Sequence, residues 1–222
     1  VKSTPNGSWH KVAVHGRTGQ AMSAALPPYS SLTHQQAPAL EFPSWEEQTL
    51  ANGLRVVVAR RPNSPVTEYR YFAPGGFAAD PSGQEGLGTL MMDLRDEAAG
   101  GRDALELART LERSGAHLSA AASLDHFHVS LSTVRGLETE PLQLFSDVLL
   151  DAEYRPADFA RRRALLEARI AQERASPFSL GLRALPPLLY GSKHPYGRAL
   201  TGSGRPESLA KIDLDAIRAH AS

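Results

Sequence analysis

The chain has 222 residues, of which 41% are apolar, so it is long enough to bury a core and most consistent with one domain plus an extension. Lys plus Arg and Asp plus Glu number 24 each, and this balance gives no support to a nucleic acid or an anionic membrane as a general partner. Cysteine is absent, which excludes disulfides and thiolate metal sites, and no apolar run approaches transmembrane or signal-peptide character. The first residue is Val1, so we expect a processed or partial product.

Residues 1–40 are predicted to be an extension or linker, and residues 41–222 the folded domain. Prolines break any helical pattern in the extension; they are Pro5, Pro27, Pro28 and Pro38. Val12 and Val14 alternate with polar residues and indicate at most one short isolated strand there.

In the first half of the domain, the sequence predicts two strands followed by two helices. Asn52-Gly53 predicts a turn before a strand at 54–59, which we expect to pair with a strand at 66–72. Apolar residues at helical spacing then predict a buried helix; they are Leu87, Leu90, Met91, Leu94 and Ala98. Asp103 and Glu106 resemble a capping box that starts a second helix, which ends at Gly115.

Residues 117–133 alternate as a strand. One face carries Phe127, Val129 and Leu131, and the other carries His126, His128, Ser130 and Ser132. Helices are predicted at 141–152 and 156–175, a short one at 180–185 cut by Pro186-Pro187, and one or two more at 207–220. Thr201 to Gly204 indicates a flexible connection. This grouping predicts an α+β fold, an antiparallel (mixed) sheet with helices packed on one face.

The helix at 87–98 places Thr89, Met92 and Asp93 at i, i+3 and i+4, so they share one face. Three segments around and beyond it complete a pattern: Asn52 to Val56 (NGLRV), Leu111 to Ala116 (LERSGA) and Leu189 to Gly197 (LYGSKHPYG). Together, over roughly residues 40–217, they resemble the insulinase/pitrilysin-type (inverted zincin) metallopeptidases. The closest resemblance is to the zinc-less, non-catalytic half of bacterial two-part members.

The resemblance implies that the zinc chemistry is lost. The family motif is H-x-x-E-H, two zinc ligands and a general base, and here its positions read Thr89, Met92 and Asp93. The family's third ligand falls at Arg169, and a further family Glu falls at Arg162, where cations would repel a metal ion. We therefore expect no catalytic residue, metal or cofactor in this chain, and an Asp93–Arg169 ion pair in the vacated site.

Other candidate features are weaker. His126 and His128, two residues apart on one strand face, form a rival metal site that lacks an evident third ligand. His194 is interpreted as a turn residue. Arginines outnumber acids between residues 155 and 183, which indicates either a solvated helix face with intrahelical pairs or a basic surface toward a partner.

The resemblance to this family also implies a function for the chain. The chain would pair with a zinc-bearing metallopeptidase domain, as a bacterial heterodimer or with the remainder of a longer polypeptide, and help to enclose a peptide-binding chamber. One segment is expected to be either the strand that faces the peptide or an ordinary core strand: Leu118, Ser119, Ala120, Ala121, Ala122, Ser123 and Leu124. Zinc is expected in the partner domain.

Two alternatives stay open: a structural or assembly subunit with no role in proteolysis, and an active metallopeptidase with an unrecognised metal site. The compartment is either the periplasm or the cytoplasm, with the periplasm slightly favoured. Domains of this family continue into a further strand after the last helix, so the half-domain is expected to be incomplete at its C-terminus. We expect another chain, or the remainder of the polypeptide, to supply that strand.

Overall fold

The computed structural model describes residues 42–221, and the chain divides into two compact units at Arg61 and Pro62. The predicted extension of residues 1–40, with Val12 and Val14, lies outside the described residues. In the first unit, β1 (Trp45–Thr49) and β2 (Arg55–Ala59) form an antiparallel hairpin. Its turn is the predicted Asn52-Gly53, in which Gly53 has a φ of 85° and the Leu54 N–H donates to the Asn52 side chain. The partner of β2 is β1, whereas the sequence had suggested residues 66–72.

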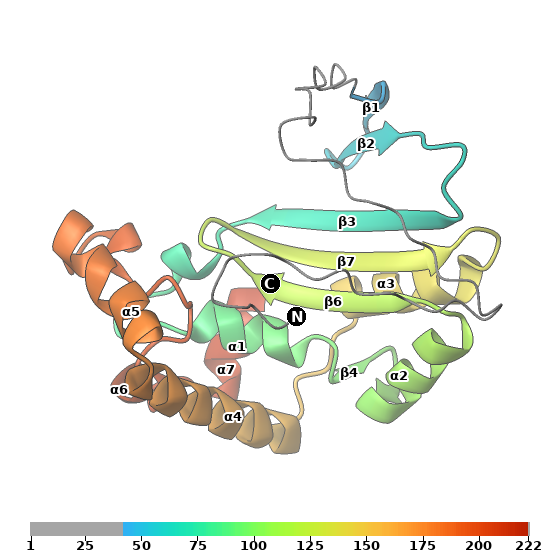
Figure 1. The fold of residues 1–222 in the computed structure, drawn as a ribbon. Coiled ribbons are helices and arrows are strands. Elements are labelled where there is room, and N and C mark those ends of the chain that lie inside the picture. Colours follow the sequence, from blue (N-terminus) through green and yellow to red (C-terminus); the bar gives the residue numbers. More distant parts are fainter. Residues whose placement is uncertain (1–41, 222) are drawn as a thin grey trace, which may run out of the picture. The chain divides into compact units, whose positions relative to one another are not determined.

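The second unit contains a three-stranded antiparallel sheet in the order β3–β7–β6 (Figure 1). Its strands are β3 (Val66–Pro74), β6 (His117–Ala122) and β7 (His126–Val134). The alternation in β7 is as predicted, because Val129 and Leu131 are buried. The prediction of one strand over 117–133 was wrong, since the Ser123 N–H donates to the His126 carbonyl and closes a two-residue hairpin loop between β6 and β7.

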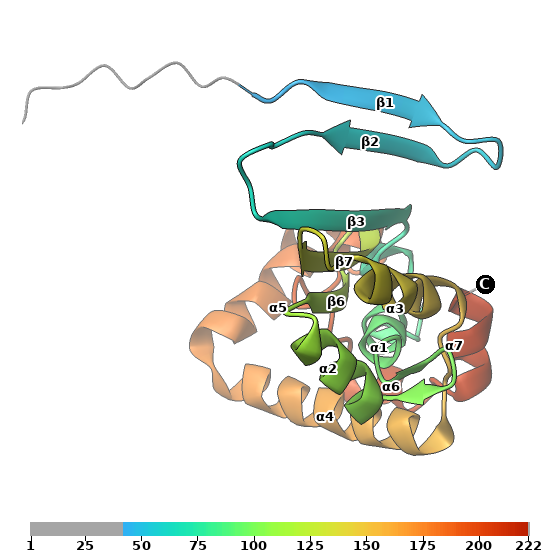
Figure 2. The same ribbon diagram turned by 90° about the vertical axis from the view of Figure 1, so that its right-hand side faces the viewer.

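Helices cover one face of this sheet, which confirms the predicted α+β class (Figures 1 and 2). The helices of the described residues are η2 (Phe77–Ala79), α1 (Leu87–Leu94), α2 (Ala104–Arg113), α3 (Thr139–Leu150), α4 (Pro156–Ala175), α5 (Pro177–Tyr190), η3 (Pro195–Gly197), α6 (Pro206–Leu209) and α7 (Leu214–Ala221). A short ribbon of β4 (Ala98–Ala99) and β5 (Arg102–Asp103) joins α1 to α2. The capping box at Asp103 and Glu106 starts α2 as predicted.

Helix α1 is the centre of the core, and seven of its eight residues are buried. A helix buried this deeply must satisfy the free N–H groups of its first turn. The Asp80 carboxylate does so by accepting from the N–H groups of Gly86 and Gly88, each at 2.8 Å. Burial raises the pKa of Asp80 to about 6, although these two hydrogen bonds oppose the shift.

The expected break of a helix at Pro186-Pro187 is not present, because α5 continues through both residues to Tyr190. Pro186 lacks the N–H that would bond the Leu182 carbonyl. That carbonyl instead accepts from the Leu200 N–H at 3.4 Å, so a hydrogen bond from the following loop replaces the lost helical one. The predicted tail helices are confirmed as α6 and α7.

Two helical glycines provide a test of how tightly α1 is packed. A Cβ added at Gly88 would lie 2.8 Å from the Phe127 ring and 2.9 Å from Oδ1 of Asp80, whereas one at Gly181 in α5 would meet nothing within 4 Å. We expect Gly88→Ala to destabilise the protein by about 1–3 kcal/mol. Gly181→Ala should be neutral or stabilise it by up to about 1 kcal/mol. Urea unfolding of both variants would measure this, and equal effects would show that α1 tolerates a side chain at position 88.

Candidate functional site

The structure places the degenerate motif positions on α1, where they serve packing. The Thr89 hydroxyl donates to the Gly202 carbonyl at 2.7 Å, and the Met92 thioether is 2% exposed in the core. Asp93 is the one residue of α1 that is not buried. A hydroxyl bonded to a carbonyl, a core thioether and one carboxylate do not fit the donor set that zinc needs, so this site does not match the metal that the resemblance implies.

The expected ion pair between Asp93 and Arg169 is not formed. Arg169 instead donates to Glu173, one turn along α4, at 3.1 Å, and to the Thr201 carbonyl at 3.2 Å. Burial raises the pKa of Asp93, and the positive charges of Arg162 and Arg169 offset only part of that effect. The cations therefore lie near Asp93 without bonding to it, because a carboxylate on the same helix is in reach of Arg169.

A different carboxylate joins α1 to α4. Glu97, which follows α1 and is 4% exposed, forms ion pairs with both Arg161 and Arg162. Arg162 stands at the position where the resemblance implies a Glu, and its positive charge is needed for the ion pair with Glu97. The sequence analysis singled out Arg162 but gave no sign of its pairing with Glu97, because the pairing depends on how α1 and α4 cross.

The segment Thr201 to Gly204 is a packed loop, so its interpretation as a flexible connection was wrong. Ser203 is fully buried and its hydroxyl donates to Glu173 at 2.7 Å. Arg183 bonds the same carboxylate at 2.7 Å and the Ser203 hydroxyl at 2.8 Å. Burial raises the pKa of Glu173, but hydrogen bonds from Ser203 and Arg183 outweigh it and the net shift is downward. This network fixes the loop against α4 and α5.

The rival site is partly assembled. The rings of His126 and His128 lie 5.6 Å apart between centroids, and Phe72 contacts both. Burial and the neighbouring His126 lower the pKa of His128, to which Arg70 also contributes. Within residues 42–221, no cluster of three or more potential ligands is present, so the pair has no third ligand there. His194 is a turn residue as predicted, accepting from the Tyr196 N–H at 3.0 Å.

The excess of arginine between residues 155 and 183 is largely matched by acids. Ion pairs join Arg155, Arg161, Arg162, Arg163, Arg169 and Arg183 to nearby Asp or Glu side chains. Arg174 is exposed, and no residue in the described part of the chain forms an ion pair with it. The predicted intrahelical pairs are present for Arg161, Arg163 and Arg169. Arg155, Arg162 and Arg183 instead pair with acids outside their own helix.

Strand β6 is the edge of the three-stranded sheet, with β7 on one side (Figure 1). The pairing of Ser123 with His126 sets the alternation, so Ser119 and Ala121 bond to β7 while the backbone groups of Leu118, Ala120 and Ala122 point away from it. No hydrogen bond from these outward groups to another described residue is found. The predicted peptide-facing strand of 118–124 is shorter than expected, because the carbonyls of Ser123 and Leu124 accept from the N–H groups of Phe77 and Ala78.

Comparison with known proteins gives the fold. No protein-family model and no curated protein matches the chain. Among solved structures, a peptidase M16 inactive domain from Pseudomonas fluorescens is 24% identical with a TM-score of 0.73, covering 79% of this chain and 42% of that one. A protease from Helicobacter pylori is 22% identical with a TM-score of 0.74, covering 81% and 43%. A conserved protein from Enterococcus faecalis is 13% identical with a TM-score of 0.69, covering 80% and 45%.

This chain has the fold of a peptidase M16 inactive domain. The resemblance seen in the sequence is thus confirmed at the level of the fold, and the chain spans less than half the length of each of these solved proteins. Among the helices of the described residues, none is long and apolar enough to cross a membrane.

The side chains at the motif positions predict that the purified chain binds no stoichiometric zinc. Elemental analysis after dialysis against zinc should find well under one ion per chain, because Met92 and Thr89 are engaged in packing and Arg162 and Arg169 lie nearby. About one ion, lost in Asp93→Ala, would contradict this. An ion lost in the double variant His126→Ala and His128→Ala would instead establish the rival site.

Proposed function

We propose that this chain is a non-catalytic, peptide-binding half of a two-part metallopeptidase, which acts together with a zinc-bearing domain. The single observation that carries the proposal is the edge of β6, with which no strand of the described residues pairs, beside a motif helix whose ligand positions are used for packing. The β6 edge offers backbone groups that could bind a peptide, and the motif helix lacks the residues that would cleave it.

The edge suits an extended peptide. An added strand would bond to the outward N–H and C=O groups of Leu118, Ala120 and Ala122, which places little demand on the peptide's sequence. The alanines of β6 are small, so they leave room for another backbone to approach. The side chains of Ala120 and Ala122 point into the core, and their contacts there hold the edge in a fixed position.

Catalysis must come from elsewhere. Met92 stands where the family has its general base, and a thioether cannot take a proton from water at neutral pH. The solved proteins that share the fold are more than twice as long as the part this chain matches, and one of them is described as a protease. A zinc-bearing domain, on another chain or in the remainder of the polypeptide, would supply the metal, and the two would enclose a chamber.

A second candidate, an assembly subunit with no role in proteolysis, is favoured by one surface. Helix α5 exposes large apolar side chains, among them Phe178 at 78% and Leu188 at 81%. Exposed apolar residues grouped on one helix are typical of an interface with another protein. Because a peptidase half also needs such an interface, the two candidates differ only in whether β6 binds peptide.

Reconstitution tests the proposal. The chain alone should not cleave a mixed peptide library, whereas its mixture with the zinc-bearing domain should show chelator-sensitive cleavage. Ala120→Pro removes one outward N–H. It should reduce the rate of that cleavage by about tenfold, because a tenfold loss corresponds to one or two backbone hydrogen bonds missing from the transition state. Ala120→Val adds similar bulk but keeps the N–H, so it is the matched control and should stay close to the unsubstituted chain.

Three results would contradict the proposal. Chelator-sensitive cleavage by the rigorously purified chain alone would make it a peptidase in its own right. A mixture that assembles but cleaves no faster than the zinc-bearing domain alone would favour the assembly subunit. Equal activity of the Pro and Val variants would show that peptides do not pair with β6.

A further inference from the structure

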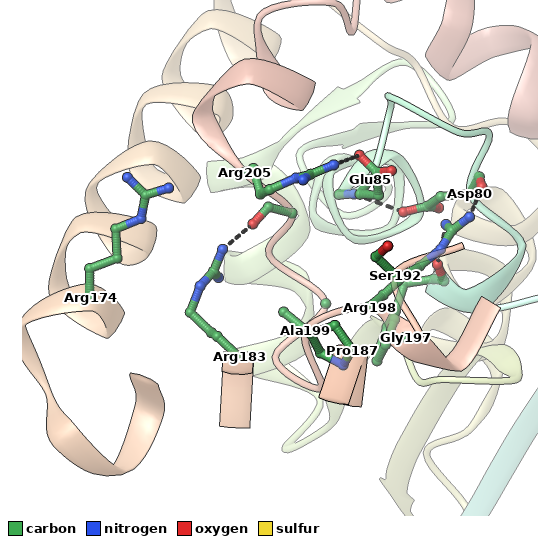
Figure 3. Close-up of a pocket in the computed structure, with 14 residues that line it drawn as sticks. Asp80, Glu85, Arg174, Arg183, Pro187, Ser192, Gly197, Arg198, Ala199 and Arg205 are labelled. Carbon is green, nitrogen blue, oxygen red and sulfur yellow. Dashed lines mark hydrogen bonds and ion pairs between the residues drawn. The ribbon is translucent and has the colours of Figure 1, made fainter. Parts of the chain in front are cut away.

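A pocket lies where η2, the start of α1, the α4–α5 region and the loop after α5 meet, with a volume of about 290 Å³ (Figure 3). Its lining includes apolar groups from Phe77, Pro187 and Ala199, and four arginines. The arginines are Arg174, Arg183, Arg198 and Arg205, and they come from α4, α5 and the loop on either side of Thr201 to Gly204. A few polar or charged groups that converge on one concave, partly apolar pocket are typical of a ligand-binding site.

Two of the four arginines have their charge matched. Arg183 pairs with Glu173 at 2.7 Å and also donates to Ser203, so it is fixed in place. Arg205 reaches Glu85 at 3.4 Å. These two side chains form part of the pocket wall, and the negative charges of Glu173 and Glu85 compensate their positive charges.

The other two are cations without a carboxylate bonded to them. Arg198 donates only to main-chain carbonyls, those of Phe77 at 3.0 Å and Asp80 at 2.5 Å. Arg174 forms no ion pair or hydrogen bond with any residue of the described chain, and in Figure 3 it stands apart from the interactions drawn around the pocket. A guanidinium keeps its charge at all ordinary pH values, so both leave positive charge beside the pocket.

The acids in the wall compensate this positive charge only in part. The Asp80 carboxylate is close enough to Arg198 to interact with it electrostatically, although no hydrogen bond joins the two side chains. The Asp80 carboxylate is occupied by the N–H groups of Gly86 and Gly88, and Glu85 accepts from the Gly83 N–H at 3.1 Å as well as from Arg205. They do limit how much negative charge the pocket can accept. A singly charged carboxylate is repelled less by them than a doubly charged phosphate would be, and the apolar lining suits a carbon skeleton.

The pocket also adjoins the open edge of the sheet. Phe77, which lines the pocket, donates its N–H to the Ser123 carbonyl just past the end of β6. Gly202, also in the lining, accepts from Thr89 of the motif helix. A peptide that lay along β6 could therefore bring its terminal carboxylate to this pocket.

We infer that this pocket is a carboxylate-binding site, with Arg174 and Arg198 as the groups that bind the anion. The carboxylate belongs either to a small organic acid or to the C-terminus of a peptide. The inference goes beyond the proposed function, because a small acid can bind here whether or not peptides pair with β6.

Calorimetric titration of the full chain tests this with four probes: succinate, N-acetyl-trialanine as the free acid, the same peptide as its C-terminal amide, and inorganic phosphate. Succinate or the free-acid peptide should bind more tightly than phosphate. Arg174→Gln should weaken that binding by about tenfold, the equivalent of one charge-assisted hydrogen bond. Arg198→Gln should do the same, but its main-chain contacts also support the fold, so Arg174→Gln is the decisive variant.

Arg109→Gln is the matched control, because Arg109 is an exposed arginine on α2 outside the pocket and its loss should change affinity by less than about twofold. A free acid that outcompetes the amide identifies a peptide terminus, and succinate binding without any peptide binding identifies a small acid; both support the site. The inference is overturned if succinate fails to bind and the acid has no advantage over the amide. It is also overturned if phosphate binds most tightly, or if Arg109→Gln is as damaging as Arg174→Gln.

Discussion

The hydrogen bonds from the first turn of α1 to the Asp80 carboxylate allow the rest of the second unit to pack as it does. The sheet, α4 and α7 all pack against α1, which therefore has no solvent to satisfy its free N–H groups. Asp80 supplies an anion where the helix dipole is positive, and the two bonds hold it there in spite of the cost of burial. Arg198 then fixes the main chain of Asp80 and Phe77, which connects η2 to the loop after α5.

This arrangement explains how a helix with the frame of a metal-binding motif can be purely structural. Position 89 holds the loop at Gly202 against α1, and position 92 fills the core. On α4, Arg162 bonds Glu97 and Arg169 bonds Glu173, so the positions at which a metal site would need carboxylates instead bear cations with their own partners. Each replacement contributes a contact to the fold.

Periodicity and capping signals were sufficient for most local elements: the α1 stripe from Leu87 to Leu94, the capping box of α2, the length of α4 and the alternation of β7 all follow from short-range rules. The predicted helix was too long at its end, because α1 stops at Leu94 and Ala98 lies in β4. The errors have a common cause in tertiary contacts. Leu200 satisfies the carbonyl that Pro186 leaves free, and the bond between Ser123 and His126 divides one predicted strand into two. For the site, the sequence located Asp93 and Arg169, and Arg169 bonds Glu173 one turn along its own helix. Only the crossing of α1 and α4 decides that Glu97 bonds Arg161 and Arg162.

The central claim is that β6 is an open edge to which an extended peptide adds. Amide hydrogen exchange on this chain mixed with the zinc-bearing domain that we propose as its partner, with and without an uncleavable peptide, tests it residue by residue. Ser119 and Ala121 already bond to β7 and serve as internal references that should not change. The account predicts slower exchange at Leu118, Ala120 and Ala122 when peptide is present. Unchanged exchange at these three amides under saturating peptide would contradict it.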